Sequence, residues 1–306
     1  MRRGEVWWVN PDFQFSQANL QDYVDCPRRF QLRYLLQLAW PAVEAEPAGE
    51  FEAHIAQGEA FHRLIHQHLL GLPAERLSRM VAASAADDVE GTGETGRLSD
   101  WWADYLRAGP ADLPPLRHPE ITLSAAVSGH RLLAKYDLIA VEPGRRAVIV
   151  DWKTSRNRPQ RAWLTARLQT RVYRYLLVRA GAHLNGGRPI DPETVAMTYW
   201  FANHPDDPET FPYDAVQHRA DGEYLAALIA EIVLEPIAGL ADDDFPLTGD
   251  EGRCRFCPYR SLCDRGVEAA PLGLDEGADD MGWAEPEAEA ALDTAFDFDQ
   301  IAEIAF

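Results

Sequence analysis

The 306-residue sequence has very little lysine and cysteine, and it has no long apolar run. Lys135 and Lys153 are its only lysines, and it has no GxxxxGK[ST] sequence, which excludes a self-contained phosphate-loop motor. No apolar stretch approaches the ~20 residues of a membrane-spanning helix. The start of the chain lacks the apolar core of a secretion signal. We therefore expect a cytoplasmic protein that does not associate with membranes.

Negative charge is abundant, and it is unevenly distributed. The chain has 29 Lys and Arg against 49 Asp and Glu, a net charge of −20. Residues 264–306 carry 13 acidic residues and one Arg, so residues 1–263 have a net charge of only −8. The global charge argues against nonspecific coating of nucleic acid. We expect residues 266–306 to be a disordered acidic tail that docks a protein partner, solubilises the chain or mimics DNA.

The remainder has enough apolar residues, 46% of the chain, for a buried core. Apolar periodicity predicts helices first, over 16–38 (with Ser16 as N-cap), 51–70 and 98–108, with an acidic, glycine-rich loop over 84–96. It then predicts strands over 120–128, 131–142 and 146–152, a helix over 159–180, strands over 195–202 and 212–217, and a helix over 220–237. This order predicts an α/β fold, a mixed sheet with helices packed on it.

The most informative window is the end of the predicted strand 146–152. Alternation places Asp151 and Lys153 on one face and Trp152 on the other. A carboxylate beside an ammonium suits hydrolysis, in which the acid holds a divalent metal and the lysine positions or helps to deprotonate water. An isolated D-x-K is more often a surface ion pair. Asp137, in an apolar setting on the preceding strand, supplies a second carboxylate, and together these residues form a plausible Mg²⁺ site.

The helix that follows carries a local excess of positive charge. Between Arg156 and Arg179 there are seven arginines and no acidic residue: Arg156, Arg158, Arg161, Arg167, Arg171, Arg174 and Arg179. Arginine suits phosphate contacts, so this block is a candidate nucleic-acid surface; an ordinary solvated helix is the alternative. Gln169 and Tyr173, one turn apart, either face the catalytic site or lie at an ordinary amphipathic boundary.

The four cysteines form the second constellation. Cys254, Cys257 and Cys263 lie within ten residues, and Cys26 is the fourth. Three cysteines so close together cannot all form good disulfides, whereas four thiolates fit a structural Zn²⁺ or a [4Fe–4S] cluster. Such a site would clasp the N-terminal helix to the end of the domain. His62, by contrast, is by itself an ordinary helical histidine.

Together these features resemble the PD-(D/E)XK nuclease superfamily, in its RecB-like, iron–sulfur-containing branch. Within that branch they resemble the CRISPR-associated adaptation exonucleases and the nuclease domain of the AddB helicase subunit. The matching elements, in the family's order, are Phe15-Ser16 to Phe30 with Cys26-Pro27, Gly58 to His62, Asp137, Asp151-Trp152-Lys153-Thr154, Gln169 to Tyr173, and the three closing cysteines. The resemblance implies a restriction-endonuclease-like domain over 14–265, with a helical insertion at about 51–110. An arm over 1–13 and the acidic tail flank it.

The resemblance also implies roles for individual residues. His62, Asp137, Asp151 and the Trp152 carbonyl would bind Mg²⁺ or Mn²⁺, Lys153 would activate water, and Gln169 and Tyr173 would support DNA. It favours [4Fe–4S] over Zn²⁺. The expected activity is that of a metal-dependent deoxyribonuclease, an exonuclease acting on single-stranded or frayed DNA ends. The alternative is a non-catalytic DNA-binding or scaffold subunit that works with a helicase or with CRISPR integration proteins.

Overall fold

The structure is a computed structural model that describes residues 9–10, 12–38, 48–87, 94–234, 245–254 and 257–266. Most of the predicted N-terminal arm, residues 267–306 of the acidic tail and residues 235–237 of the last predicted helix lie outside these ranges. In the part of the chain that is described, no helix is both long and apolar enough to cross a membrane.

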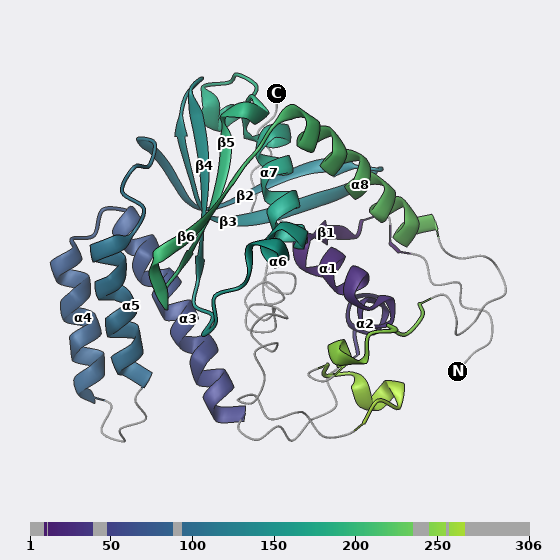
Figure 1. Ribbon diagram of the computed structural model, residues 1–306, viewed down its shortest axis with the longest axis horizontal. Coiled ribbons are helices and arrows are strands. Elements are labelled where there is room, and N and C mark those ends of the chain that lie inside the picture. Colours follow the sequence, from purple (N-terminus) through teal and green to yellow (C-terminus); the bar gives the residue numbers. More distant parts are fainter. Residues whose placement is uncertain are drawn as a thin grey trace.

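A mixed sheet of six strands forms the centre of the structure (Figure 1). Its strands are β1 (Gln14–Ser16), β2 (Leu116–Val127), β3 (His130–Glu142), β4 (Arg146–Lys153), β5 (Val195–Phe201) and β6 (His204–Pro212). The order is β1-β3-β4-β5-β6, and β2 pairs with the other edge of β3. The β1–β3 and β4–β5 pairs are parallel, whereas the pairs β2–β3, β3–β4 and β5–β6 are antiparallel. The prediction of an α/β fold with a mixed sheet flanked by helices is confirmed.

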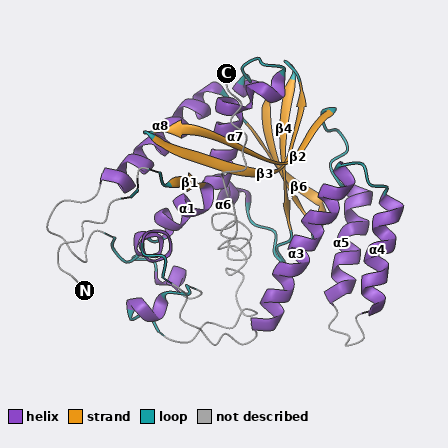
Figure 2. Ribbon diagram, turned by 180° about the vertical axis from the view of Figure 1, so that it is seen from behind, coloured by secondary structure: helices purple, strands orange, loops and turns teal. Residues whose placement is uncertain are grey.

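One face of the sheet is covered by α7 (Leu168–Ala180), with α8 (Ala215–Leu234) beside it, and by α1 (Gln17–Asp25) (Figure 2). Ile149 of β4, Met197 of β5 and Leu176 of α7 are fully buried in the core on this side. Alternate residues of the same strands point to the other face, as the period of a strand requires.

The other face packs against α3 (Ala48–Leu69), α4 (Ala74–Asp87) and α5 (Glu94–Ala108), which form a second core rich in tryptophan. Trp152 of β4 and Trp200 of β5 lie in it, and Phe61 of α3 stacks on Trp200. These helices occupy the predicted insertion. α4 was not predicted, and its last residues fall in the segment 84–96 that the sequence suggested was a loop. α4 continues to Asp87, and α5 begins at Glu94, so the interval between helices is shorter than expected.

The predicted single helix over 16–38 is wrong. Ser16 does cap α1, its side chain and that of Asn19 forming a reciprocal capping box. However, Cys26 is extended, with φ −163°, and the short helix α2 (Pro27–Phe30) starts with its proline in the first turn. A π-helical turn, Gln31–Leu35, follows. Proline lacks the N–H that a continuing helix would need, which explains the break.

Four further elements differ from the predictions in their boundaries. The helix over 159–180 is two helices, α6 (Arg161–Ala166) and α7, because Arg167 between them has ψ 138°. The strand expected at 212–217 lies earlier in the chain, as β6, and α8 begins at Ala215 rather than at 220. β2 begins at Leu116 and includes Pro119, which an edge strand tolerates.

The cysteine segment lies beside the N-terminal helices. Two short 3₁₀ turns, Glu251–Cys254 and Arg260–Cys263, carry it. Cys257 and Tyr259 pack with Leu32 in a small separate apolar cluster, and Cys263 lies against it. Arg253, next to Cys254, forms an ion pair with Asp25, next to Cys26, so the two sequence-distant cysteine segments lie at the same end of the fold.

Candidate active site

The end of β4 presents a buried carboxylate and a lysine on the same face of the sheet. Asp151 is 3% exposed, and the Nζ atom of Lys153 lies 2.9 Å from its Oδ2 atom. Trp152, between them, points into the tryptophan-rich core on the opposite face. The predicted alternation is therefore what the structure shows, and it joins the two groups in an ion pair largely shielded from water.

Asp137 lies opposite Asp151, one step beyond the last paired residues of β3 and β4. The ladder between these strands ends at Leu138 and Val150. Beyond that point the Trp152 N–H donates a 2.8 Å hydrogen bond to the Asp137 carboxylate. The side chain of Asp137 thus takes the place of a backbone partner where the β3–β4 ladder ends, in the middle of β3.

His62 of α3 completes this group. Its Nδ1 atom is 3.3 Å from the Asp137 carboxylate. Burial alone would raise the pKa of Asp137, but His62, the Trp152 N–H and Lys153 together lower it, so the carboxylate is ionised. An ionised carboxylate next to an imidazole is a donor set that suits a divalent cation.

Sequence reasoning missed Glu120. It lies on β2, in the position opposite Asp137, and its backbone has φ +53°. Ligand atoms of His62, Glu120 and Asp137 all lie within 4.8 Å of one another, which makes these three residues a candidate metal site. Lys135 forms an ion pair with Glu120. No motif marks Glu120, because its approach depends on the pairing of β2 with β3.

The structure separates the roles of Gln169 and Tyr173. The Gln169 side chain donates a 2.7 Å hydrogen bond to Oδ1 of Asp151. Tyr173 is 2% exposed, and its hydroxyl donates to the backbone carbonyl of Lys135 at 2.7 Å. Gln169 therefore orients a site carboxylate, while Tyr173 fixes β3 two residues before Asp137.

The family model of the PD-(D/E)XK nuclease superfamily matches residues 14–264. The chain belongs to the PD-(D/E)XK nuclease superfamily. Several solved structures are similar to it. SSO0001 shares 15% identity over 83% of this chain and 87% of its own, with a TM-score of 0.37. A candidate exonuclease from Eubacterium rectale shares 10% identity over 73% of this chain and 80% of its own, with a TM-score of 0.41. No curated protein matches.

Nucleases of this superfamily typically use divalent metals, and the group formed by His62, Glu120 and Asp137 is a candidate site for such an ion. The donors present, carboxylate oxygens and one imidazole, are those that Mg²⁺ and Mn²⁺ accept in proteins. The side chains at this site of the PD-(D/E)XK nuclease therefore suit Mg²⁺ or Mn²⁺.

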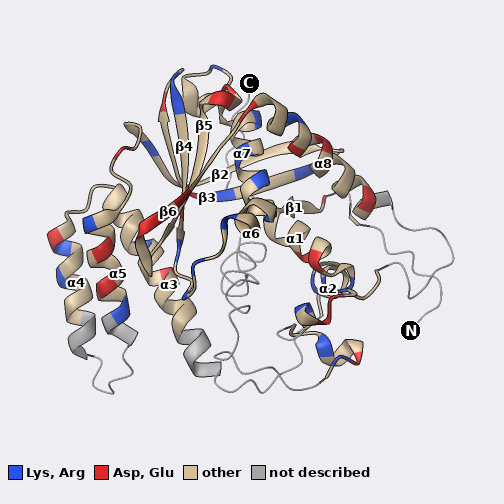
Figure 3. Ribbon diagram, viewed as in Figure 1, with Lys and Arg blue, Asp and Glu red and all other residues tan. Residues whose placement is uncertain are grey.

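Several arginines of the block in this nuclease form ion pairs with acids of other elements. Figure 3 marks the charged residues along the ribbon. Arg158 pairs with Asp207 and Glu209 of β6. Arg161 pairs with Glu209. Arg167 lies 3.9 Å from Asp25, and Arg171 lies 3.0 Å from Asp221. Arg174 is buried and bonds to the carbonyls of Thr170 and Pro212. Arg156 is exposed. Four of the seven arginines thus form ion pairs with acids, whereas Arg179, like Arg156, is exposed.

The four thiols lie close enough to affect one another. Burial raises the pKa of Cys257 to about 11, and the nearby thiols of Cys26 and Cys263 contribute to the increase. Burial likewise raises the pKa of Cys254 and Cys263, again with a contribution from Cys26. Mutual repulsion between their thiolate forms is what a cation or cluster at this place would relieve.

Proposed function

We propose that the protein is a metal-dependent deoxyribonuclease that hydrolyses phosphodiester bonds, as an exonuclease on single-stranded or frayed DNA ends. The observation that carries this proposal is the convergence of Asp137, Asp151 and Lys153 at the point where the pairing of β3 with β4 ends. Removing charged groups from water costs free energy, so two carboxylates and a lysine held together in this way indicate a functional site.

In this proposal His62, Asp137, Asp151 and the Trp152 carbonyl hold Mg²⁺ or Mn²⁺. Glu120 lies within reach of the same ion. The bound metal supplies Lewis-acid activation of the scissile phosphate and of the attacking water. Lys153, ion-paired to Asp151, donates hydrogen bonds that orient the water and offset charge developing on the phosphate. Gln169 keeps the Asp151 carboxylate in place.

The exposed Arg156, together with Arg158, Arg167 and Arg171, is our candidate contact with DNA. Arg158, Arg167 and Arg171 already have acidic partners, so DNA would have to share or displace those ion pairs. We further propose a cytoplasmic location and a helicase or CRISPR integration proteins as partners. Gln169 and Tyr173 would support DNA through the strands and carboxylates that they hold.

We infer that Cys26, Cys254, Cys257 and Cys263 ligate one [4Fe–4S] cluster, with structural Zn²⁺ as the alternative. The inference is supported by the gathering of the four cysteines at one end of the fold and by the mutual effect of their thiols. Analysis of iron, acid-labile sulfide and zinc in anaerobically purified protein distinguishes the two metals.

The nuclease proposal is tested with end-labelled single- and double-stranded DNA and Mn²⁺, using anaerobically purified protein. Wild type should cleave, Lys153→Ala should not, and the pattern of labelled products reports the polarity. Arg146→Ala is the matched control, because Arg146 lies on the same strand at its other end and pairs with the exposed Asp112. If wild type with its metals bound binds DNA but never cleaves it, the stand-alone nuclease is refuted in favour of a scaffold or partner-dependent subunit.

A further inference from the structure

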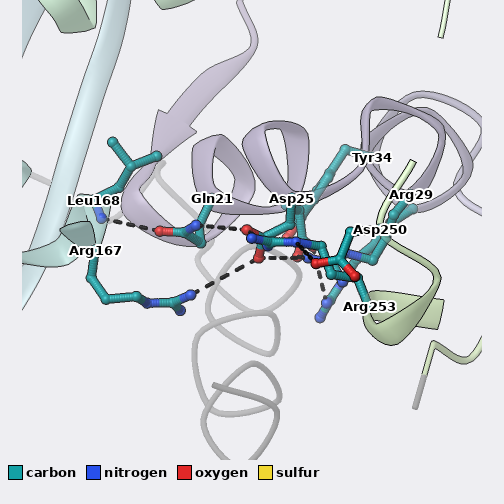
Figure 4. A network of polar contacts seen from close by, with 10 residues as sticks. Gln21, Asp25, Arg29, Tyr34, Arg167, Leu168, Asp250 and Arg253 are labelled. Atoms are coloured by element: carbon teal, nitrogen blue, oxygen red, sulfur yellow. Dashed lines mark hydrogen bonds and ion pairs between the residues drawn. The ribbon is translucent and has the colours of Figure 1, made fainter. Parts of the chain in front are cut away.

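Gln21 of α1 bridges two parts of the molecule that the active-site motifs do not connect (Figure 4). Its side-chain carbonyl accepts a 3.0 Å hydrogen bond from the backbone N–H of Leu168. Its side-chain amide donates a 2.9 Å hydrogen bond to Asp25, one turn further along α1. Gln21 is 9% exposed, so both bonds are formed away from bulk water.

The first of these bonds caps α7. Leu168 is the first residue of that helix, and Arg167 before it is extended and provides no side-chain cap. The first N–H groups of a helix have no partner within the helix and need one from elsewhere. Gln21 supplies that partner from a different helix, and it thereby fixes where α7 begins.

The start of α7 in turn determines the position of a catalytic carboxylate. The residue after Leu168 is Gln169, whose side chain donates the 2.7 Å bond to Asp151. A shift of the Leu168 backbone would carry Gln169 with it. Groups that hold a metal-binding carboxylate through hydrogen bonds affect metal affinity strongly, because they fix its orientation.

The second bond anchors Gln21 on the cysteine side. Asp25 is 7% exposed, and its carboxylate also forms ion pairs with Arg29, at 3.1 Å, and with Arg253. Arg253 immediately precedes Cys254, and Arg29 follows Cys26 by three residues. Asp25 is therefore held on two sides by chain segments that carry cysteines, and it holds the amide end of Gln21 (Figure 4).

We propose that Gln21 is a positioning residue of the active site, which holds the start of α7 so that Gln169 orients Asp151 for metal binding. This inference rests on the proposed function insofar as it takes Asp151 to be a metal ligand. It adds to that function a residue of α1 that touches neither the metal ligands nor DNA in the proposal. It also gives the cysteine segment a mechanical connection to the catalytic carboxylates.

The test measures Mn²⁺ affinity without DNA, by electron paramagnetic resonance, and then kcat and KM on labelled DNA. Gln21→Met keeps the length of the side chain and removes both hydrogen bonds. We expect it to weaken Mn²⁺ binding and to lower kcat, each about tenfold, with KM for DNA unchanged. Gln31→Met is the matched control, because Gln31 is also buried and its side chain accepts a hydrogen bond from Arg28. Gln31→Met should bind Mn²⁺ as wild type does.

A double-mutant cycle with Gln169→Ala separates positioning from general stabilisation. If Gln21 acts through Gln169, adding Gln21→Met to Gln169→Ala weakens Mn²⁺ binding no further. Gln21→Glu keeps an acceptor for the Leu168 N–H but replaces the amide that donates to Asp25 with a carboxylate, so we expect a loss of Mn²⁺ affinity smaller than that in Gln21→Met.

Additive losses in the cycle, an unchanged Mn²⁺ affinity in Gln21→Met, or a loss in Gln21→Glu as large as in Gln21→Met would each overturn the proposal. Failure of both Gln21 variants to fold would assign the residue to global stability and overturn it as well. Mn²⁺ binding by a wild type that cleaves no DNA would instead defeat the proposed nuclease function and leave the role of Gln21 to be decided by the binding data.

Discussion

Gly58 of α3 lies so close to Thr154, at the end of β4, that a Cβ atom on the glycine would come within 3.0 Å of the threonine Oγ1. His62 is one turn further along the same helix and faces Asp137. The absence of a side chain at Gly58 therefore lets α3 approach the strand that carries Asp151 and Lys153. The close approach of α3 to β4 sets the distance between His62 and the carboxylates.

Gly58→Ala should separate stability from activity. Alanine favours a helix over glycine by up to about 1 kcal/mol, so the free energy of unfolding should be unchanged or higher. The contact with Thr154 should push α3 outward by a few tenths of an ångström and lower the cleavage rate about tenfold. Thermal unfolding and steady-state kinetics measure the two effects. Thr154→Ala in the same chain removes the clash and should restore most of the rate; a rate that stays low would refute the steric explanation.

Glu120→Gln should weaken divalent-metal binding about tenfold without unfolding the protein. The substitution keeps the shape of the side chain and removes a negative charge from the group formed with His62 and Asp137. Mn²⁺ titration followed by calorimetry measures the change. Glu142→Gln is the control, because Glu142 lies at the far end of β3 and pairs with the exposed Arg145. Equal Mn²⁺ affinities for wild type and Glu120→Gln would show that Glu120 forms its ion pair with Lys135 but does not bind the metal.

Arg156→Ala should lower the affinity for single-stranded DNA and reduce the slope of log K against log salt by about 0.7, the value for one lost phosphate contact. Arg156 is the exposed arginine at the start of the block. Arg76→Ala, an exposed arginine on α4, should leave the slope as it is in wild type. Fluorescence anisotropy at several salt concentrations gives the slopes, and equal slopes for the two variants would remove Arg156 from the DNA-binding surface.

Asp221 should give the protein a pH-dependent stability. Burial raises its pKa even though Tyr213 and Arg171 contact the carboxylate. The folded state therefore binds the Asp221 proton more tightly than the unfolded chain does, and this contribution to stability is lost as the pH rises above about 4. The free energy of unfolding of Asp221→Asn, relative to that of wild type, should consequently rise between pH 4 and pH 7. Denaturant unfolding at both pH values measures the gain, and a difference that does not vary with pH would contradict it.

The sequence predicted the part of the site that depends on the alternation of side chains along a single strand. Alternation along one strand was enough to place Asp151 and Lys153 together and Trp152 on the opposite face. The proximity of Asp137 follows from pairing between consecutive strands joined by a short turn. Nothing local marks Glu120, whose carboxylate reaches the site through an irregular edge strand with φ +53°.

Errors arose where distant segments supply the partner. The arginines after Arg156 seemed uncompensated because Asp207 and Glu209 of β6 follow about fifty residues later in the chain. β6 itself, rich in proline and acid, does not have the pattern of a strand, and it forms as an edge strand paired with β5. At Pro27, in contrast, the sequence did contain the signal, and the break after α1 could have been predicted.

Both lysines of the chain lie against acids of this site, Lys153 on Asp151 and Lys135 on Glu120. Lysine side-chain amines therefore occur nowhere else in the molecule. A reagent selective for lysine amines would label side chains at this candidate site only, and protection of the two lysines would report a bound metal ion or DNA end. What the composition shows as a scarcity thus makes this centre selectively addressable by chemical labelling.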